Sequence, residues 1–160
     1  METTVNAREL LRHCVASTAY RAGKVLRDAP ESFADFKAAE STRTPAQILA
    51  HMGDLFDWAL SIAKGRQVWH DSSPLPWKQE VARFFDSLKK FDDYLSGEEA
   101  LHTSVEKLFQ GPVADAASHI GQLAMLRRMA QVPIRAENYY QAEIASGRVG
   151  LDQAAPKQEF

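Results

Sequence analysis

Apolar residues recur every three to four positions along most of this chain, and proline or glycine interrupts the pattern at intervals. This spacing places apolar side chains on one face of an α-helix, whereas a half-buried strand would carry them at every second position. Alternation of the second kind is nearly absent. The sequence therefore predicts an all-α fold, with long amphipathic helices separated by loops that contain proline or glycine.

Four long helices are predicted, over about residues 5–28, 44–65, 77–96 and 112–131. Thr44-Pro45 is typical of a helix start, because threonine can cap the first turn and proline suits the first helical position. The predicted ends coincide with helix-breaking residues. These are Ala29-Pro30, Gly65, Ser96-Gly97 and Pro133.

Shorter segments connect or follow these helices. Residues 31–43 are expected to form a partly ordered crossover, residues 66–76 a loop, and residues 105–109 a short segment ended by Gly111-Pro112. A short helix is predicted over residues 136–145, and the tail from about Asp152 is expected to be disordered. The whole predicts a single domain over residues 1–160, a four-helix up-down bundle with a short extra C-terminal helix. Periodicity leaves a packing of five or six helices open.

Composition excludes several classes of function. The formal net charge of the 160 residues is −2 with both signs interspersed, so no basic surface is expected for nucleic acid or for an anionic membrane. The opening METTVNARELLRH has charges early and lacks the apolar run of a signal peptide, and no stretch approaches a membrane span. The single cysteine, Cys14, fits a reducing compartment. A cytoplasmic protein is predicted, with Cys14 interpreted as a small buried hydrophobe or, alternatively, as a reactive or intermolecularly bridged thiol.

Three polar residues lie beside the apolar faces of two predicted helices. His51 falls between Ile48 and Leu55, and Asp115 and His119 are four positions apart, hence one turn apart on the same face. His51 lies six residues beyond Pro45, and His119 seven beyond Pro112. In an up-down bundle the second and fourth helices run parallel, so the three side chains are expected to meet at one level.

Two imidazoles and one carboxylate suit zinc, nickel or iron(II), and three protein ligands leave positions open for water or substrate. Gln122 lies nearly on the same face as His119, where it could orient a ligand. The alternative is that Asp115 and His119 form only a surface ion pair, with His51 a core histidine. The other histidines and the tryptophans are expected to be surface or packing residues: His13, His70, His102, Trp58, Trp69 and Trp77. No nucleophile elbow or glycine-rich phosphate loop occurs.

Two stretches resemble a known family. TPAQILAHMGDLFDWAL (44–60) resembles the second helix of the DinB-like, or YfiT-type, metalloenzymes, and DAASHIGQLAMLRRM (115–129) resembles their last bundle helix with its H-x-G-Q pattern. ENYYQAEIASGRVG (137–150) resembles the tail of one subgroup. The resemblance implies a four-helix bundle, often a homodimer, that holds a divalent metal. His51 and His119 match the usual ligands, whereas Asp115 stands where histidine is more common. A carboxylate is used at the equivalent place in the related mycothiol-dependent maleylpyruvate isomerase.

Several relatives in that family are transferases or isomerases that use a low-molecular-weight thiol. The resemblance therefore implies a metal-dependent enzyme, a transferase or hydrolase that activates a thiol or water against a small substrate. Candidate substrate-binding residues are Arg127, Arg128, Tyr139, Tyr140 and Arg148. Two alternatives remain open: a non-catalytic bundle that acts as a dimer or with a stress-related partner, and a module that binds a small ligand in a dry pocket without turnover.

Overall fold

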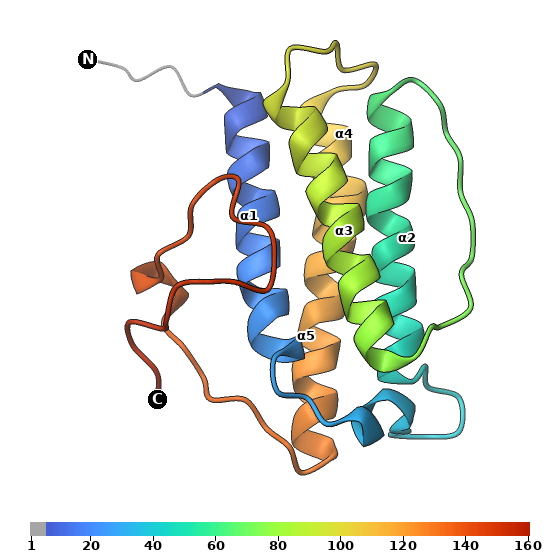
Figure 1. The fold of residues 1–160 in the computed structure, drawn as a ribbon, viewed down its shortest axis with the longest axis vertical. Helices are drawn as coiled ribbons and strands as arrows, with labels where there is room; N and C mark the ends of the chain where they lie inside the picture. The colour runs from blue at the N-terminus through green and yellow to red at the C-terminus, as the bar shows by residue number, and fades with distance from the viewer. Residues whose placement is uncertain (1–5) are drawn as a thin grey trace.

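A computed structural model describes residues 6–160 and shows an all-helical bundle, which confirms the predicted class (Figure 1). Three rods are single helices: α1 (Ala7–Leu26), α2 (Pro45–Ala63) and α3 (Trp77–Ser96). The fourth joins α4 (Val105–Leu108), a π-helical turn (Phe109–Val113) and α5 (Ala114–Met129). Two 3-10 turns, Glu31–Asp35 and Tyr139–Gln141, complete the described helical structure. The predicted start of the first helix at residue 5 lies outside the described residues.

Local chemistry sets the helix starts close to the predicted positions. The Asn6 side chain accepts hydrogen bonds from the first turn of α1, at the Arg8 and Glu9 amides. At the start of α2, Thr44 and Gln47 each accept a hydrogen bond from the other's backbone N–H, which satisfies two helical amides that have no partner within the helix. Because these caps hold the first turn of α2, the position of His51 one turn further on is well defined.

The fourth rod continues through Gly111-Pro112, where the sequence predicted a break. Pro112 has no N–H to donate and crowds the carbonyl one turn before it, so it normally ends or kinks a helix. Here the chain widens into the π turn Phe109–Val113, and α5 follows directly. The predicted interruption is therefore wrong, and residues 105–129 form one rod that carries Asp115 and His119 near its middle.

The connectivity of the bundle differs from the predicted up-down order. Contacts between α2 and α3 advance together along both helices: Ala50 O accepts from Arg83, Phe56 packs on Phe84, and the Tyr94 hydroxyl reaches Ala63 O. Helices α2 and α3 are therefore parallel. The connection between them, residues 64–76, runs back along the whole bundle (Figure 1). About 13 extended residues span roughly 40 Å, more than the roughly 30 Å length of a 20-residue helix.

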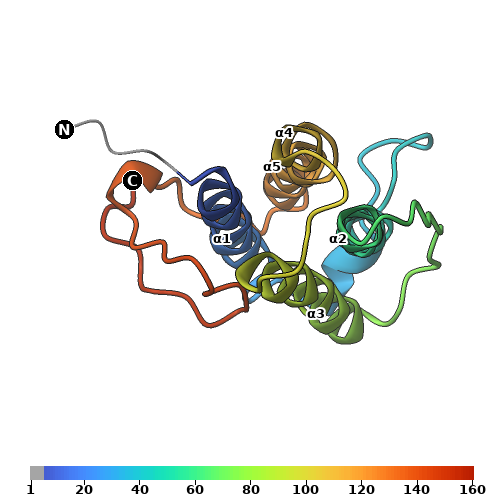
Figure 2. The ribbon, with the colours of Figure 1, turned by 90° about the horizontal axis from the view of Figure 1, so that it is seen from above.

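Helix α2 runs antiparallel to α5, contrary to the sequence-based expectation. Ile48, near the start of α2, shares a hollow with Leu126 near the end of α5, and His51 packs on His119 closer to its start. Viewed from above, α5 lies between α1 and α2 on one side, and α3 covers the other side (Figure 2). This arrangement brings the predicted ligands of α2 and α5 face to face.

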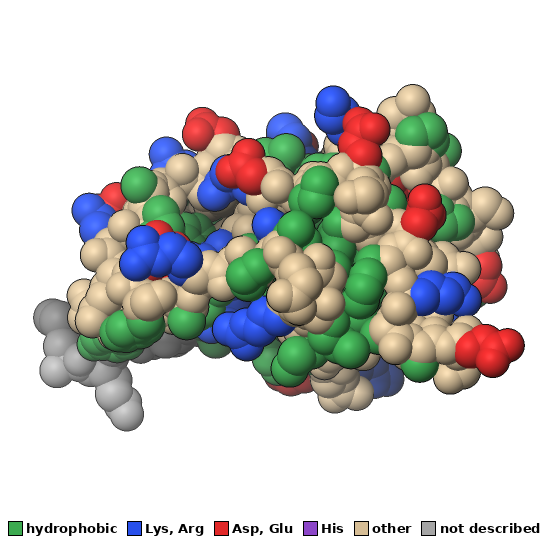
Figure 3. Space-filling view, turned by 90° about the horizontal axis from the view of Figure 1, so that it is seen from below, with side chains coloured by type: hydrophobic (Ala, Val, Ile, Leu, Met, Phe, Trp, Pro, Cys, Tyr) green, Lys and Arg blue, Asp and Glu red, His purple; other side chains and the backbone are tan. Residues whose placement is uncertain are grey.

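The core is built from the inward faces of all four rods. Its largest fully buried side chains are mostly aromatic and aliphatic: Phe33, Phe56, Phe84, Phe91, Leu11, Leu49, Met52, Leu88, Leu95, Leu108 and Leu123. Burying each of these contributes roughly 1.5–3 kcal/mol relative to leaving it exposed. At the lower end of the bundle apolar side chains also reach the surface, among interspersed acidic and basic ones (Figure 3).

The C-terminal segment corrects two expectations. Residues 136–145 do not form a helix, because only Tyr139–Gln141 makes a 3-10 turn. The tail from Asp152 is not disordered in the structure: Phe160 N donates to Ala136 O, and Glu137 pairs with Glu159 in an isolated bridge. The segment packs beside α1, on the side away from α2 (Figures 1 and 2). Within residues 6–160, no helix is both long and apolar enough to cross a membrane.

Candidate metal centre

His51, Asp115 and His119 meet between α2 and α5. His51 lies in the second turn of α2, and Asp115 and His119 lie one turn apart near the start of α5. The His51 Nε2 atom is 3.5 Å from Asp115 Oδ2, and the His119 Nε2 atom is 3.5 Å from Asp115 Oδ1. All three residues are partly exposed, so a ligand could reach them from solvent. The structure thus brings the three predicted residues together.

The spacing of these atoms suits a shared cation better than a direct hydrogen bond. At 3.5 Å, both imidazole–carboxylate separations exceed the usual range of such a bond. Ligand atoms roughly 2.0–2.1 Å from a tetrahedral zinc ion lie roughly 3.4 Å from one another. One ligand atom from each residue lies within 4.8 Å of the others. Small side-chain rotations would therefore let all three point at one ion.

Gln122 orients the imidazole of His119. The His119 Nδ1 atom lies 2.8 Å from Gln122 Oε1, one turn further along α5. An amide oxygen only accepts, so Nδ1 carries the proton and donates it. The Nε2 atom is then left with its lone pair toward Asp115, which is the form of imidazole that binds a metal. The contact places Gln122 where it could orient a metal ligand, and that role stays a prediction.

The surroundings of His51 favour the neutral form of its imidazole. Burial, together with the nearby His119 and Arg43, lowers the pKa of its imidazole below the ordinary value, although Asp115 acts in the opposite direction. The ring of Trp69 packs against it edge-on, with centroids 5.6 Å apart, and Trp58 packs against Trp69 in turn. A neutral imidazole is the metal-binding form, so these neighbours favour coordination near neutral pH.

Hydrogen bonds and ion pairs hold the 64–76 connection against α2 and α3, next to the candidate centre. The buried Asp54, on α2, accepts hydrogen bonds from the Ser72 amide and hydroxyl at 2.8 and 2.7 Å and pairs with Arg83 of α3. His70 Nε2 lies 3.0 Å from Asp54 Oδ1. We call Asp54, His70, Ser72 and Arg83 the loop clasp. Gly53 makes room for it, since a Cβ there would lie 2.9 Å from the Arg83 guanidinium.

Two residues of the loop clasp, Asp54 and His70, form a second set of potential ligands together with the neighbouring Asp57. The Arg83 guanidinium already pairs with both carboxylates, as well as with Glu80. It therefore supplies the positive charge that a cation would bring, and the set is better suited to holding the loop than to binding metal. Trp69, whose ring contacts His51, directly precedes His70 of the clasp in the same connection.

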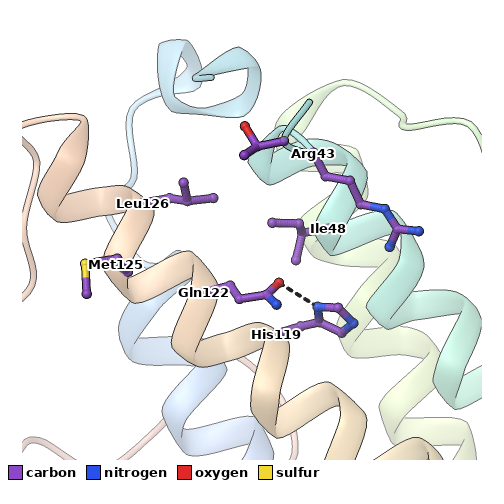
Figure 4. A pocket seen from close by; sticks show the side chains of 7 residues that line it. Arg43, Ile48, His119, Gln122, Met125 and Leu126 are labelled. Carbon is purple, nitrogen blue, oxygen red and sulfur yellow. Dashed lines mark hydrogen bonds between the residues drawn. The ribbon is translucent and has the colours of Figure 1, made fainter. Parts of the chain in front are cut away.

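Two hollows flank the candidate centre. One, of about 490 Å³, is lined by Arg43, His119 and Gln122 and by the apolar side chains of Ile48, Met125 and Leu126 (Figure 4). We call it the apolar groove. The other, of about 340 Å³, lies on the far side of His51 and is lined by polar residues that include Arg43 and Asp71. A small molecule in either hollow would lie beside the candidate metal ligands.

The predicted substrate-binding residues lie elsewhere. Arg127 is buried and donates to the carbonyls of Val25, Arg27 and Val132, so it caps the end of α1. Tyr139 packs on Tyr20 and under the guanidinium of Arg21, while Tyr140 is 92% exposed. Arg128 is exposed on α5, and Arg148 belongs to the segment beside α1. None of these five residues lines a hollow beside His51, within the described part of the chain.

Sequence reasoning missed two residues of the site. Trp69 was interpreted as packing, and its contact with His51 depends on the path of the long connection. Arg43 was unremarked, although it directly precedes the cap of the helix that carries His51. Its position next to the start of that helix is the one feature of the sequence that could have placed Arg43 near the site. For Cys14, burial raises the pKa of the thiol, which favours the packing interpretation over the reactive one.

Comparison of the chain with family models, with curated proteins and with solved structures finds no match. Its function is therefore inferred from the residues of the site.

Proposed function

We propose that this protein is a metal-dependent enzyme of the DinB-like type, in which His51, Asp115 and His119 hold one divalent cation. The observation that carries the proposal is the convergence of two imidazole Nε2 atoms on opposite oxygens of one carboxylate, each at 3.5 Å. The donor set favours zinc, nickel or iron(II). Such a cation lowers the pKa of a thiol or water bound to it and so supplies a nucleophile at neutral pH.

The protein's own residues prepare the site for this role. Asp115 offsets one of the two positive charges, and Gln122 fixes the ring of His119. The ring of Trp69 packs edge-on against His51 and so restricts the orientation of its imidazole. The apolar groove admits a small molecule next to His119. The thiol cofactor, the homodimer and the cytoplasmic location stay predictions.

A metal titration of the full chain tests the proposal. After chelator treatment, the protein is expected to bind one equivalent of zinc in calorimetry. It should also bind one equivalent of cobalt(II), with the visible absorption bands typical of four- or five-coordinate cobalt(II). His51→Ala and His119→Ala should each weaken zinc binding at least a hundredfold, because two protein ligands hold the ion poorly. The matched control is His13→Ala, since His13 is exposed on α1 and should leave the affinity unchanged.

Circular dichroism and thermal melting establish that each variant is folded. If the folded wild-type chain takes up no zinc, nickel or iron(II), or if uptake is the same in both variants as in the control, the proposed function is wrong. Binding of a small molecule in the groove without metal uptake or turnover would instead support a ligand-binding module, which the apolar lining of the groove favours as the second candidate.

A further inference from the structure

Arg43 brings a positive charge close to the candidate metal centre. Within residues 6–160, its guanidinium takes part in none of the side-chain hydrogen bonds or ion pairs. By contrast Arg83, which also packs against α2, is bound by Asp54, Asp57 and Glu80. A guanidinium presents five N–H donors and stays charged at any physiological pH, so an unpaired one beside a hollow is well suited to an anion.

The position of Arg43 directs it toward the site. It precedes the Thr44 cap of α2 and lines both hollows, the apolar groove beside His119 and the polar hollow beside His51. The polar hollow already contains carboxylates, Asp54 and Asp71, whereas no acidic residue lines the apolar groove. An anion is therefore better accommodated in the apolar groove. Figure 4 shows the Arg43 guanidinium beyond Ile48 as seen from Met125 and Leu126, so its flexible side chain has to turn toward the groove to bind an anion there.

The remaining polar group of the groove is also a donor. Gln122 uses its amide oxygen to accept from His119, which leaves its NH₂ group for a ligand. The Thr42 hydroxyl is occupied by Ala39, to whose carbonyl it donates at 2.8 Å. The polar lining thus offers N–H donors from Arg43 and Gln122, and a ligand must present acceptor oxygens to satisfy them.

The rest of the groove is apolar. Ile48 and Leu126 form buried walls, and Met125 is 54% exposed at the rim. Inorganic phosphate would leave these surfaces in contact with water, whereas a short hydrocarbon chain would cover them. The lining therefore favours an organic anion over an inorganic one.

We propose that the substrate is a small organic carboxylate, bound through its carboxylate by Arg43 and through a short apolar body by Ile48, Met125 and Leu126. This inference rests on the proposed function, because the metal centre supplies the reaction and Arg43 selects what reaches it. Arg43 is thus a specificity-determining residue, and Gln122 donates a second hydrogen bond to the same ligand.

The experiment compares two probes of equal size that differ in charge, hexanoate and hexanamide, by calorimetry and by ligand-observed NMR. The zinc-loaded wild-type chain is expected to bind hexanoate at least tenfold more tightly than hexanamide. Arg43→Gln should weaken hexanoate binding about tenfold and change hexanamide binding less than twofold. Arg128→Gln is the matched control, since Arg128 is exposed on α5 outside the groove.

A metal-free arm separates this inference from the proposed function. A carboxylate can also bind zinc directly, which would favour hexanoate without any help from Arg43. The affinities of the wild type and of Arg43→Gln for hexanoate and hexanamide are therefore measured again after the metal has been removed with a chelator. If the protein binds no zinc but keeps this selectivity, the proposed function fails and the role of Arg43 stands. If hexanoate binds no better than hexanamide, if Arg43→Gln leaves its affinity unchanged, or if inorganic phosphate binds as tightly as hexanoate, the inference is wrong.

Discussion

At the scale of single residues, the site depends on which nitrogen of His119 carries the proton. The imidazole can bind a metal through Nε2 only if that atom keeps its lone pair, and the hydrogen bond from Nδ1 to Gln122 Oε1 secures this arrangement. A cation is therefore bound with the help of a residue that does not touch it. Substituting a residue that hydrogen-bonds to a metal ligand commonly weakens metal affinity and leaves the fold unchanged.

Gln122→Ala is expected to weaken zinc binding roughly ten- to a hundredfold while the thermal stability of the metal-free protein stays unchanged. The loss of stability should be small because Gln122 is exposed on α5. Gln122→Glu keeps an accepting oxygen and should retain most of the affinity. Competition with a chromophoric zinc chelator measures both constants. Equal weakening by the two substitutions would show that the hydrogen bond to His119 has no part in binding.

Helical spacing alone left His51, Asp115 and His119 open as either a metal site or a surface ion pair beside a core histidine. The resemblance to the DinB-like family was what favoured the metal site. The reason given for their meeting was wrong. The prediction places the three residues at equal depth on parallel helices, but α2 and α5 are antiparallel. The residues meet because the second turn of α2 lies beside the first turns of α5. The neighbours Arg43 and Trp69 could not be predicted, because their contacts depend on loops that carry no periodic signal.

At the scale of the elements, the connection over residues 64–76 contains no helix, so side-chain contacts with the bundle have to hold it in place. The loop clasp does this through a buried carboxylate. Asp54 receives hydrogen bonds from Ser72 and pairs with Arg83, and it also approaches His70. A buried charge of this kind is tolerated only while all its partners remain, so the connection and helices α2 and α3 stabilise one another.

Asp54→Asn is expected to lower the free energy of unfolding by about 3 kcal/mol at pH 7, because Arg83 loses a buried partner. Burial alone would raise the pKa of Asp54, but the hydrogen bonds from Ser72 and Arg83 outweigh it and hold the pKa below the ordinary 3.8. The advantage of the wild type over the variant is therefore fully present above the unfolded-state pKa and disappears as pH falls through the lower folded-state pKa.

Urea unfolding of both proteins, from pH 7 down to about pH 3, measures this difference. Asp93→Asn serves as the control, because Asp93 forms an exposed pair with Lys89 on α3 and should show no measurable loss at pH 7. A difference between wild type and Asp54→Asn that stays constant through the acidic range would contradict the role of the carboxylate.

At the scale of the whole molecule, the C-terminal segment and the candidate metal centre lie on opposite sides of the bundle. The segment is anchored on α1 by Glu137, whose buried carboxylate accepts from the Tyr20 hydroxyl at 2.5 Å and from Lys24 Nζ at 2.8 Å. Lys24 also pairs with Glu159 at 2.7 Å. The sequence predicts a helix followed by a disordered tail here, because its polar composition gives no sign that one glutamate is buried.

Glu137→Gln is expected to lower the free energy of unfolding by about 2 kcal/mol, because Lys24 and Tyr20 lose their shared charged acceptor. Zinc affinity, measured well below the melting temperature, should change less than twofold, since the helices that carry His51 and His119 do not depend on this anchor. Glu143→Gln is the matched control: Glu143 pairs with Lys157 at an exposed position of the same segment and should leave stability unaltered. If Glu137→Gln lowers the free energy of zinc binding by as much as it lowers the free energy of unfolding, the prediction is wrong. The C-terminal segment and the metal centre would then be energetically coupled.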